Sequence, residues 1–167
     1  MKMTKLKLFI LSIYWLSLEL MAITPTVNVL QEIYFGVILP SSGGCRMIAS
    51  TGAIISNNGL NTCILPEDSQ NGLYTITANP NKIIRVSVQP NQDNDAGIIF
   101  NPFIELVSEG FVTKIIFNNT GEQTINSGVD GIVDLYLGGD LLINTTYGFN
   151  KTIPFSFLDA IVWSEDP

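Results

Sequence analysis

The chain has 167 residues, with 15 acidic and eight basic side chains, a net charge of −7 and no histidine. A length of this order suits one domain with a sizeable core. Without histidine there is no serine–histidine or cysteine–histidine catalytic pair, and two cysteines alone cannot complete a zinc site.

The N-terminal stretch is typical of a secretory signal peptide. Three lysines precede an apolar run from Leu8 to about Leu20, and the small residue Ala22 marks the expected cleavage site. The run is about 13 residues long, whereas a membrane-spanning helix needs about 20. We therefore expect residues 1–22 to be removed and residues 23–167 to form one domain. The mature chain is expected to be secreted, periplasmic or at the cell surface, without a membrane span.

Removal of this segment makes the chain more acidic. It takes away three basic residues and only one acid, Glu19, which leaves five basic and fourteen acidic residues and a net charge of −9. A surface of this sign repels nucleic acid, and no basic cluster remains to bind it. We expect no nucleic-acid partner.

The two cysteines lie near the outer ends of two predicted strands, which are joined by a stretch rich in Gly and Asn. In an oxidising compartment an even cysteine count favours a disulfide. Antiparallel pairing of the two strands would bring Cys45 and Cys63 close enough to form it. We predict a structural disulfide that pins this hairpin, because the Cys-x-x-Cys spacing of redox sites is absent.

The rest of the chain has the two-residue period of β-strands. Five segments show it, namely residues 73–78, 83–89, 111–117, 132–137 and 152–157. Clusters of Gly, Pro, Asn and Asp separate them, and no stretch keeps a helical period for three turns. The pattern predicts an all-β protein, an antiparallel immunoglobulin-like β-sandwich. Two layouts stay open: a sandwich complete within the chain, and a pilin-like one with an open edge.

Proline marks the last of these segments as an edge strand. Pro154 cannot donate a ladder hydrogen bond, so a strand that contains it belongs at the edge of a sheet. Such an edge can accept a strand from another chain, or the proline can protect it from doing so. The sequence leaves both alternatives open.

The stretch Val129–Ile143, VDGIVDLYLGGDLLI, contains two alternating runs that meet at two glycines. We predict that Gly138 and Gly139 supply the positive-φ residues of a tight hairpin between two strands. The role of this stretch is then structural.

A glycosidase-type carboxylate pair is formally possible among five acids in the second half of the chain. They are Glu105, Glu109, Asp130, Asp134 and Asp140. A small acidic sandwich brings carboxylates together by chance, so we expect a protein that is not an enzyme and has no cofactor and no metal.

Three weaker patterns have structural explanations. Asp93–Gly97, DNDAG, is similar to the start of a calcium loop but lacks the later ligands, and turns prefer the same residues. Asn-x-Ser/Thr triplets, which matter only in a eukaryotic secretory pathway, begin at Asn118, Asn144 and Asn150. A sugar-stacking platform could be built from Tyr74, Tyr136, Tyr147 and Trp163, although core packing explains such residues better.

Three longer stretches, taken in order, resemble the bacterial family known as domain of unknown function 4402. They are EIYFGVILPSSGG at residues 32–44, GLYTITANPNKIIRVSVQP at residues 72–90, and GVDGIVDLYLGGDLLINTTYGFNKTIPFSF at residues 128–157. The Phe-Gly pair of the family is matched by Phe35 and Gly36, a later Gly-Gly by Gly43 and Gly44, the Gly-Gly-x-Leu turn by Gly138, Gly139 and Leu141, and a Gly-aromatic step by Gly148 and Phe149.

The resemblance implies a secreted, all-β protein whose layout is similar to pilin-like and spore-coat-like subunits, in which a neighbour's strand finishes the sandwich. It implies an assembly role through self-association or a surface-assembly partner, and no catalytic residues. This chain differs in three ways. Residues 23–34, which Pro25 interrupts, are too short for both a donor segment and a first strand. The cysteine pair is not typical of the family, and the tail at residues 158–167 could complete the sandwich itself.

The sequence therefore predicts a non-enzymatic secreted or cell-surface structural subunit, of a fimbria or an extracellular matrix. The alternative is a monomeric extracellular binding module for carbohydrate or protein.

Overall fold

The computed structural model describes residues 24–39, 41–56, 62–65, 68–93, 97–112, 121–144 and 157–167. About 61% of these residues lie in strands and 3% in helix, and every strand pair is antiparallel. The predicted all-β class is confirmed. The expected signal peptide at residues 1–22 lies outside the described residues.

The described residues form 13 strands. They are β1 (Thr26–Gln31), β2 (Val37–Ile38), β3 (Gly43–Met47), β4 (Ile54–Ser56), β5 (Cys63–Leu65), β6 (Gly72–Thr77), β7 (Ile83–Val88), β8 (Asn91–Asp93), β9 (Ile98–Ser108), β10 (Phe111–Val112), β11 (Gln123–Asn126), β12 (Ile132–Ile143) and β13 (Ile161–Glu165). A 3₁₀ turn, η2 (Leu158–Ala160), precedes β13.

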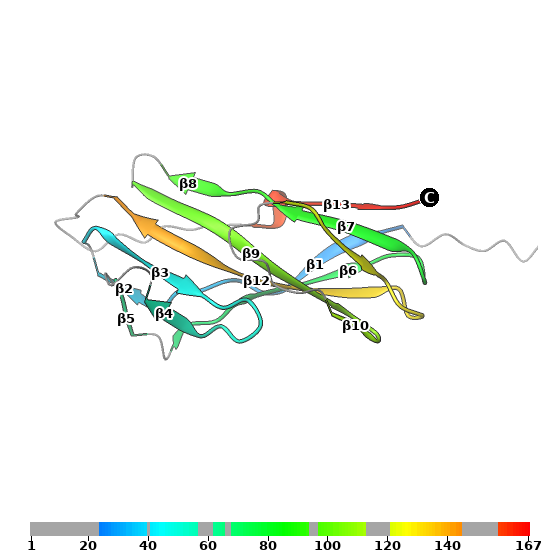
Figure 1. The fold of residues 1–167 in the computed structure, drawn as a ribbon, viewed down its shortest axis with the longest axis horizontal. Coiled ribbons are helices and arrows are strands. Elements are labelled where there is room, and N and C mark those ends of the chain that lie inside the picture. Colours follow the sequence, from blue (N-terminus) through cyan, green and yellow to red (C-terminus); the bar gives the residue numbers. More distant parts are fainter. Residues whose placement is uncertain are drawn as a thin grey trace, which may run out of the picture.

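Strand β12 is the centre of the larger sheet. On one side it pairs along nearly its whole length with β9, from Val133 opposite Ser108 to Ile143 opposite Ile98. On the other side its first half pairs with β6 and its second half with β3. The edge strands β1 and β4 extend β6 and β3, while β8 and β10 pair with the two ends of β9. Figure 1 shows the long, twisted β9–β12 pair running through the molecule.

A second sheet of order β11-β7-β13 covers one face of the larger one, and the small sheet β2-β5 lies beside β3 and β4 (Figure 1). The inward residues of the β11-β7-β13 sheet include Ile84, Val86, Ile125 and Ile161. They share one buried cluster with apolar residues of β6, β9 and β12. Alternation puts one face of each strand into this core and the other into solvent. The two sheets therefore form a sandwich around a common core.

The two glycines of β12 are not in a turn, so the predicted hairpin at Gly138 and Gly139 is wrong. Both lie inside a continuous 12-residue strand, at the point where its partner changes. Pairing with β6 ends at Leu137 and pairing with β3 begins at Gly139. At Gly138 a side chain is excluded for steric reasons. A Cβ at Gly138 would lie 2.5 Å from the carbonyl oxygen of Met47 and 2.6 Å from the backbone nitrogen of Ala49.

At Gly139 the neighbouring core atoms leave no space for a side chain. Its Cβ would meet the carbonyl oxygen of Asn101 and the ring of Phe100. Its φ of +156° also favours glycine. The glycine pair thus allows close packing of distant segments within one long strand.

The predicted strands at residues 73–78 and 83–89 correspond to β6 and β7, and the one at residues 132–137 is the first half of β12. The strand predicted from residue 111 is described only as β10. Of the strand predicted at residues 152–157, residues 152–156, with Pro154, lie outside the described residues, and Phe157 is not in a strand. Strand β9 was not predicted. Consecutive burial of Pro102, Phe103 and Ile104 hides its alternation.

We predict that Gly138→Ala lowers the free energy of unfolding by about 2 kcal/mol, because the new methyl group overlaps the backbone at the end of β3. Thermal and urea unfolding measure the change. Thr124→Ala, at an exposed position of β11, is the control and should stay within about 0.5 kcal/mol of the parent. Equal stability of the two variants would rule out close packing at the partner change.

Candidate functional site

The predicted disulfide is confirmed, but it does not pin a hairpin. Cys45 on β3 is bonded to Cys63 on β5, and both residues are buried. Strand β3 pairs with β4, whereas β5 pairs with β2 in a separate sheet. The bond therefore joins the small sheet to the larger one. Its burial and its place between sheets indicate a structural role.

Phe35 and Gly36, the first pair of the family resemblance, have structural positions. Phe35 is buried, and its ring meets that of Phe100 edge-on at a centroid distance of 5.8 Å. Phe100 in turn packs against Phe157 at 4.7 Å. Gly36 has φ +74°, a backbone conformation that favours glycine. The pair turns the chain after the segment that follows β1 and anchors it in the core.

The aromatic residues considered for a sugar-stacking platform occupy different places in the fold where they are described. Tyr74 is fully buried, Trp163 packs against the core from the second sheet, and Tyr147 lies outside the described residues. Tyr136 is partly exposed on the outer face of the larger sheet, opposite Leu73 and Glu105. For the described residues the preferred interpretation, core packing, accounts for Tyr74 and Trp163, and Tyr136 remains as a partly exposed aromatic side chain.

The Tyr74 hydroxyl reaches the rim of the core, where it donates a hydrogen bond of 3.1 Å to Glu32. Burial and then the neighbouring carboxylate raise the pKa of Tyr74 well above its ordinary value. The phenol therefore stays protonated and acts as a hydrogen-bond donor.

Three of the five candidate acids, Asp130, Asp134 and Asp140, have separate partners. Asp130 accepts a hydrogen bond from the backbone of Ile132 in a turn, and Asp134 accepts one from the hydroxyl of Thr75 across the sheet. Asp140 is buried and paired with Arg46. Each of these three carboxylates thus has a structural contact.

The Arg46–Asp140 pair is a directly opposed cross-strand pair of β3 and β12. Two hydrogen bonds of 2.6 and 2.7 Å join the guanidinium to the carboxylate. The guanidinium also lies over the ring of Phe103, 5.0 Å from its centroid. The hydrogen bond to Asp140 raises the pKa of Arg46, so the guanidinium stays charged. It holds the second half of β12 in register with β3.

The remaining candidate patterns gain no support from the described residues. Residues 94–96 of the calcium-like stretch and the triplets at Asn118 and Asn150 lie outside them, while Asn144 is exposed after β12. Within the described part of the chain, no three His, Cys, Asp or Glu side chains are grouped so as to hold a metal ion.

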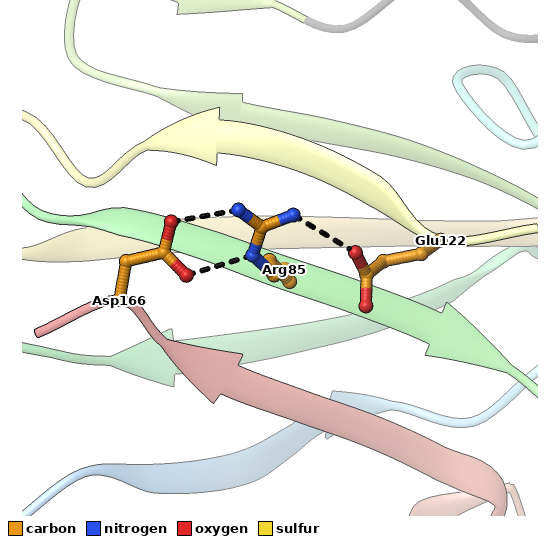
Figure 2. Close-up of polar contacts among 3 residues, drawn as sticks. All are labelled: Arg85, Glu122 and Asp166. Atoms are coloured by element: carbon orange, nitrogen blue, oxygen red, sulfur yellow. Dashed lines mark hydrogen bonds and ion pairs between the residues drawn. The ribbon is translucent and has the colours of Figure 1, made fainter.

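A second arginine, Arg85 on β7, binds two carboxylates that come from different segments (Figure 2). Asp166, just after β13, accepts hydrogen bonds of 2.7 and 2.8 Å from the guanidinium. Glu122, just before β11, accepts one of 3.1 Å. The sequence separations are 81 and 37 residues. Arg85 thus ties together the three strands of the second sheet.

A second contact fixes the same end of β13. Glu165 accepts hydrogen bonds of 2.8 and 2.9 Å from the backbone and side-chain amides of Asn79, in the turn between β6 and β7. The backbone amide of Asp166 donates to the carbonyl of Ile83. We call Arg85, Asn79, Glu165 and Asp166 the β13 clamp. No sequence motif marks it, because its partners are far apart along the chain.

The electrostatics of the β13 clamp follow from its geometry. Hydrogen bonding to Asp166 and then to Glu122 raises the pKa of Arg85. The same bonds to Arg85 lower the pKa of Asp166 below its ordinary value of 3.8. The residues are partly exposed, so salt screens the attraction. At neutral pH, charged side chains of the β13 clamp therefore hold the end of β13 against β7.

A scan against models of known protein families found no match, and searches of curated proteins and of solved structures found none either. In the described part of the chain, no helix is long and apolar enough to cross a membrane.

We predict that Arg46→Leu destabilises the fold by about 3 kcal/mol, because it leaves the buried Asp140 carboxylate without its cation. In the double variant Arg46→Leu/Asp140→Leu most of this loss should be recovered, since no charge is then buried. Urea unfolding of both variants measures the difference. A double variant as unstable as the single one would show that the pair does more than neutralise a buried charge.

We predict that Asp166→Asn lowers the melting temperature at pH 7 and has no effect in strong acid. Because the folded state lowers the pKa of Asp166, its stabilising contribution is complete above the unfolded-state pKa and is lost as pH falls through the folded-state pKa. Melting curves from neutral to acidic pH test this. Asp159→Asn, an exposed acid of η2, is the control. A gap between parent and Asp166→Asn that persists after acidification would contradict the role of this carboxylate.

Proposed function

We propose that the mature chain is a non-enzymatic structural subunit of a bacterial cell surface or extracellular assembly, exported by its N-terminal signal and related to the domain of unknown function 4402 family. The buried Cys45–Cys63 disulfide supports export, because such bonds persist in oxidising compartments. The antiparallel sandwich fits a scaffold that presents its surface to partners.

The observation that carries this proposal is that charged and polar side chains bond separate segments of the fold to one another. In the described residues, the ion pairs of Arg46 and Arg85 and the Thr75–Asp134 pair each join two segments of the fold. Arg46–Asp140 joins β3 and β12, Thr75–Asp134 joins β6 and β12, and Arg85 joins β7 with the segments flanking β11 and β13. Catalytic groups need an arrangement that serves a reacting molecule. These groups serve the fold, which supports a mechanical role.

A second candidate function is a monomeric binding module for carbohydrate or protein. It is favoured by β13, which pairs with β7 so that the chain supplies the last strand of its own second sheet. On the outer face of the larger sheet, Tyr136 lies between Leu73 and Glu105 on the neighbouring strands. Asp134, two residues before it on β12, lies on the same face. An aromatic face flanked by carboxylates can stack on a sugar ring and bond its hydroxyls.

Light scattering coupled to size-exclusion chromatography separates the two functions. Residues 23–167 should form concentration-dependent oligomers if the chain is an assembly subunit. A monomer at every concentration that binds a polysaccharide, and loses binding with Tyr136→Ala but not with Phe111→Ala, would favour the binding module instead. Phe111, which is exposed on β10 at one end of β9, is the aromatic control.

A further inference from the structure

The segment Phe157–Pro167 docks onto the rest of the sandwich as a unit. Its apolar side chains Phe157, Ile161 and Trp163 point into the common core, where Phe157 packs on Phe100. Its strand β13 pairs only with β7 among the described strands. Removal of this segment would open a groove along β7 that is apolar at its base and fits an extended strand.

The groove also has a charged end. Arg85 binds Asp166, and Asn79 binds Glu165 through two hydrogen bonds. Both partners belong to β7 or to the turn before it, so they remain in place when the segment leaves. An extended strand with two successive acids at its end is therefore the chemistry that this groove recognises.

The positive charge of Arg85 at this groove is opposite in sign to the net charge of the mature chain. The mature chain carries a net charge of −9, so two copies repel each other over most of their surfaces. Arg85 is one of only five basic residues in that chain, and it lies partly exposed where two carboxylates converge. An acidic segment of a second copy meets attraction here, in the contact geometry of Figure 2.

We propose that two copies of the chain exchange their Phe157–Pro167 segments, each β13 pairing with the β7 of the other copy. This rests on the proposed assembly function and names its contact. Twelve residues, 145–156, connect the described end at Asn144 to Phe157, a span of up to about 40 Å when extended. The exchanged pair has the same strand contacts as the single chain, so concentration decides between them. Crowding of subunits at a surface favours exchange.

A charge-swap pair tests the exchange. Arg85→Glu and Asp166→Arg are made in separate full mature chains. Each variant alone has like charges at the β13 clamp, both within a chain and between copies. In a mixture, exchange between unlike chains restores opposite charges at both clamps. The in-chain control is the double variant Arg85→Glu/Asp166→Arg, which restores attraction without exchange.

The two single variants are refolded together from urea with the disulfide intact, at about 0.1–1 mM, near the effective concentration that a short linker sets. We expect a twofold molar mass in the mixture by light scattering, the monomer mass for each single variant alone, and for the double variant the same distribution of monomer and dimer as the parent chain at that concentration. A mixture that stays at the monomer mass overturns the proposal. If the single variants fail to fold alone, recovery of the β-sheet circular dichroism signal on mixing supports exchange, and its continued absence overturns it.

The same measurements separate the two proposals. Oligomers of the parent chain without a charge-swap dimer would keep the assembly function and reject exchange as its contact. A charge-swap dimer with a parent chain that forms dimers but nothing larger would keep the exchange and reject a larger assembly as the function, and a parent chain that is monomeric at every concentration would overturn both.

Discussion

The whole fold depends on one strand that has two successive neighbours on the same side. Strand β12 pairs with β6 and then with β3, while β9 accompanies it on the other side. The segment after β3 turns away at the point where β6 begins, and this crossing leaves no room for a side chain at Gly138. Because β12 also supplies buried Val133, Leu135 and Leu137 to the core, the position of the second sheet follows from the same strand.

Two arginines do comparable work on the two sheets. Arg46 and Arg85 each bind one carboxylate through two hydrogen bonds and make one further contact, with the ring of Phe103 and with Glu122 respectively. A planar guanidinium suits such paired contacts because its donors have a fixed geometry. In an acidic chain with few cations, this placement turns a general excess of carboxylates into specific strand register.

How much the sequence predicts depends on where the cause of each feature lies. Strands β6 and β7 were predictable because their alternation is local, and the disulfide because it needs only cysteine count and compartment. The role of Gly138 was not, since the atoms that exclude its side chain belong to residues 47 and 49. The β13 clamp was equally hidden, because Arg85 and Asp166 are 81 residues apart. A Gly-Gly pair looks the same in the sequence whether it forms a tight turn or makes room for a backbone segment that packs closely against it.

The order of the strands along the chain has a consequence for folding during synthesis. A polypeptide that emerges from the ribosome N-terminal end first delivers β7 and β11 well before β13. During that interval one edge of β7 has no partner, and the places of Phe157 and Trp163 in the core are empty. An unpaired strand beside an incomplete core is the feature that drives aggregation of partly folded chains. The second sheet is therefore the part of this molecule that most needs protection while it emerges, and folding ends where β13 arrives.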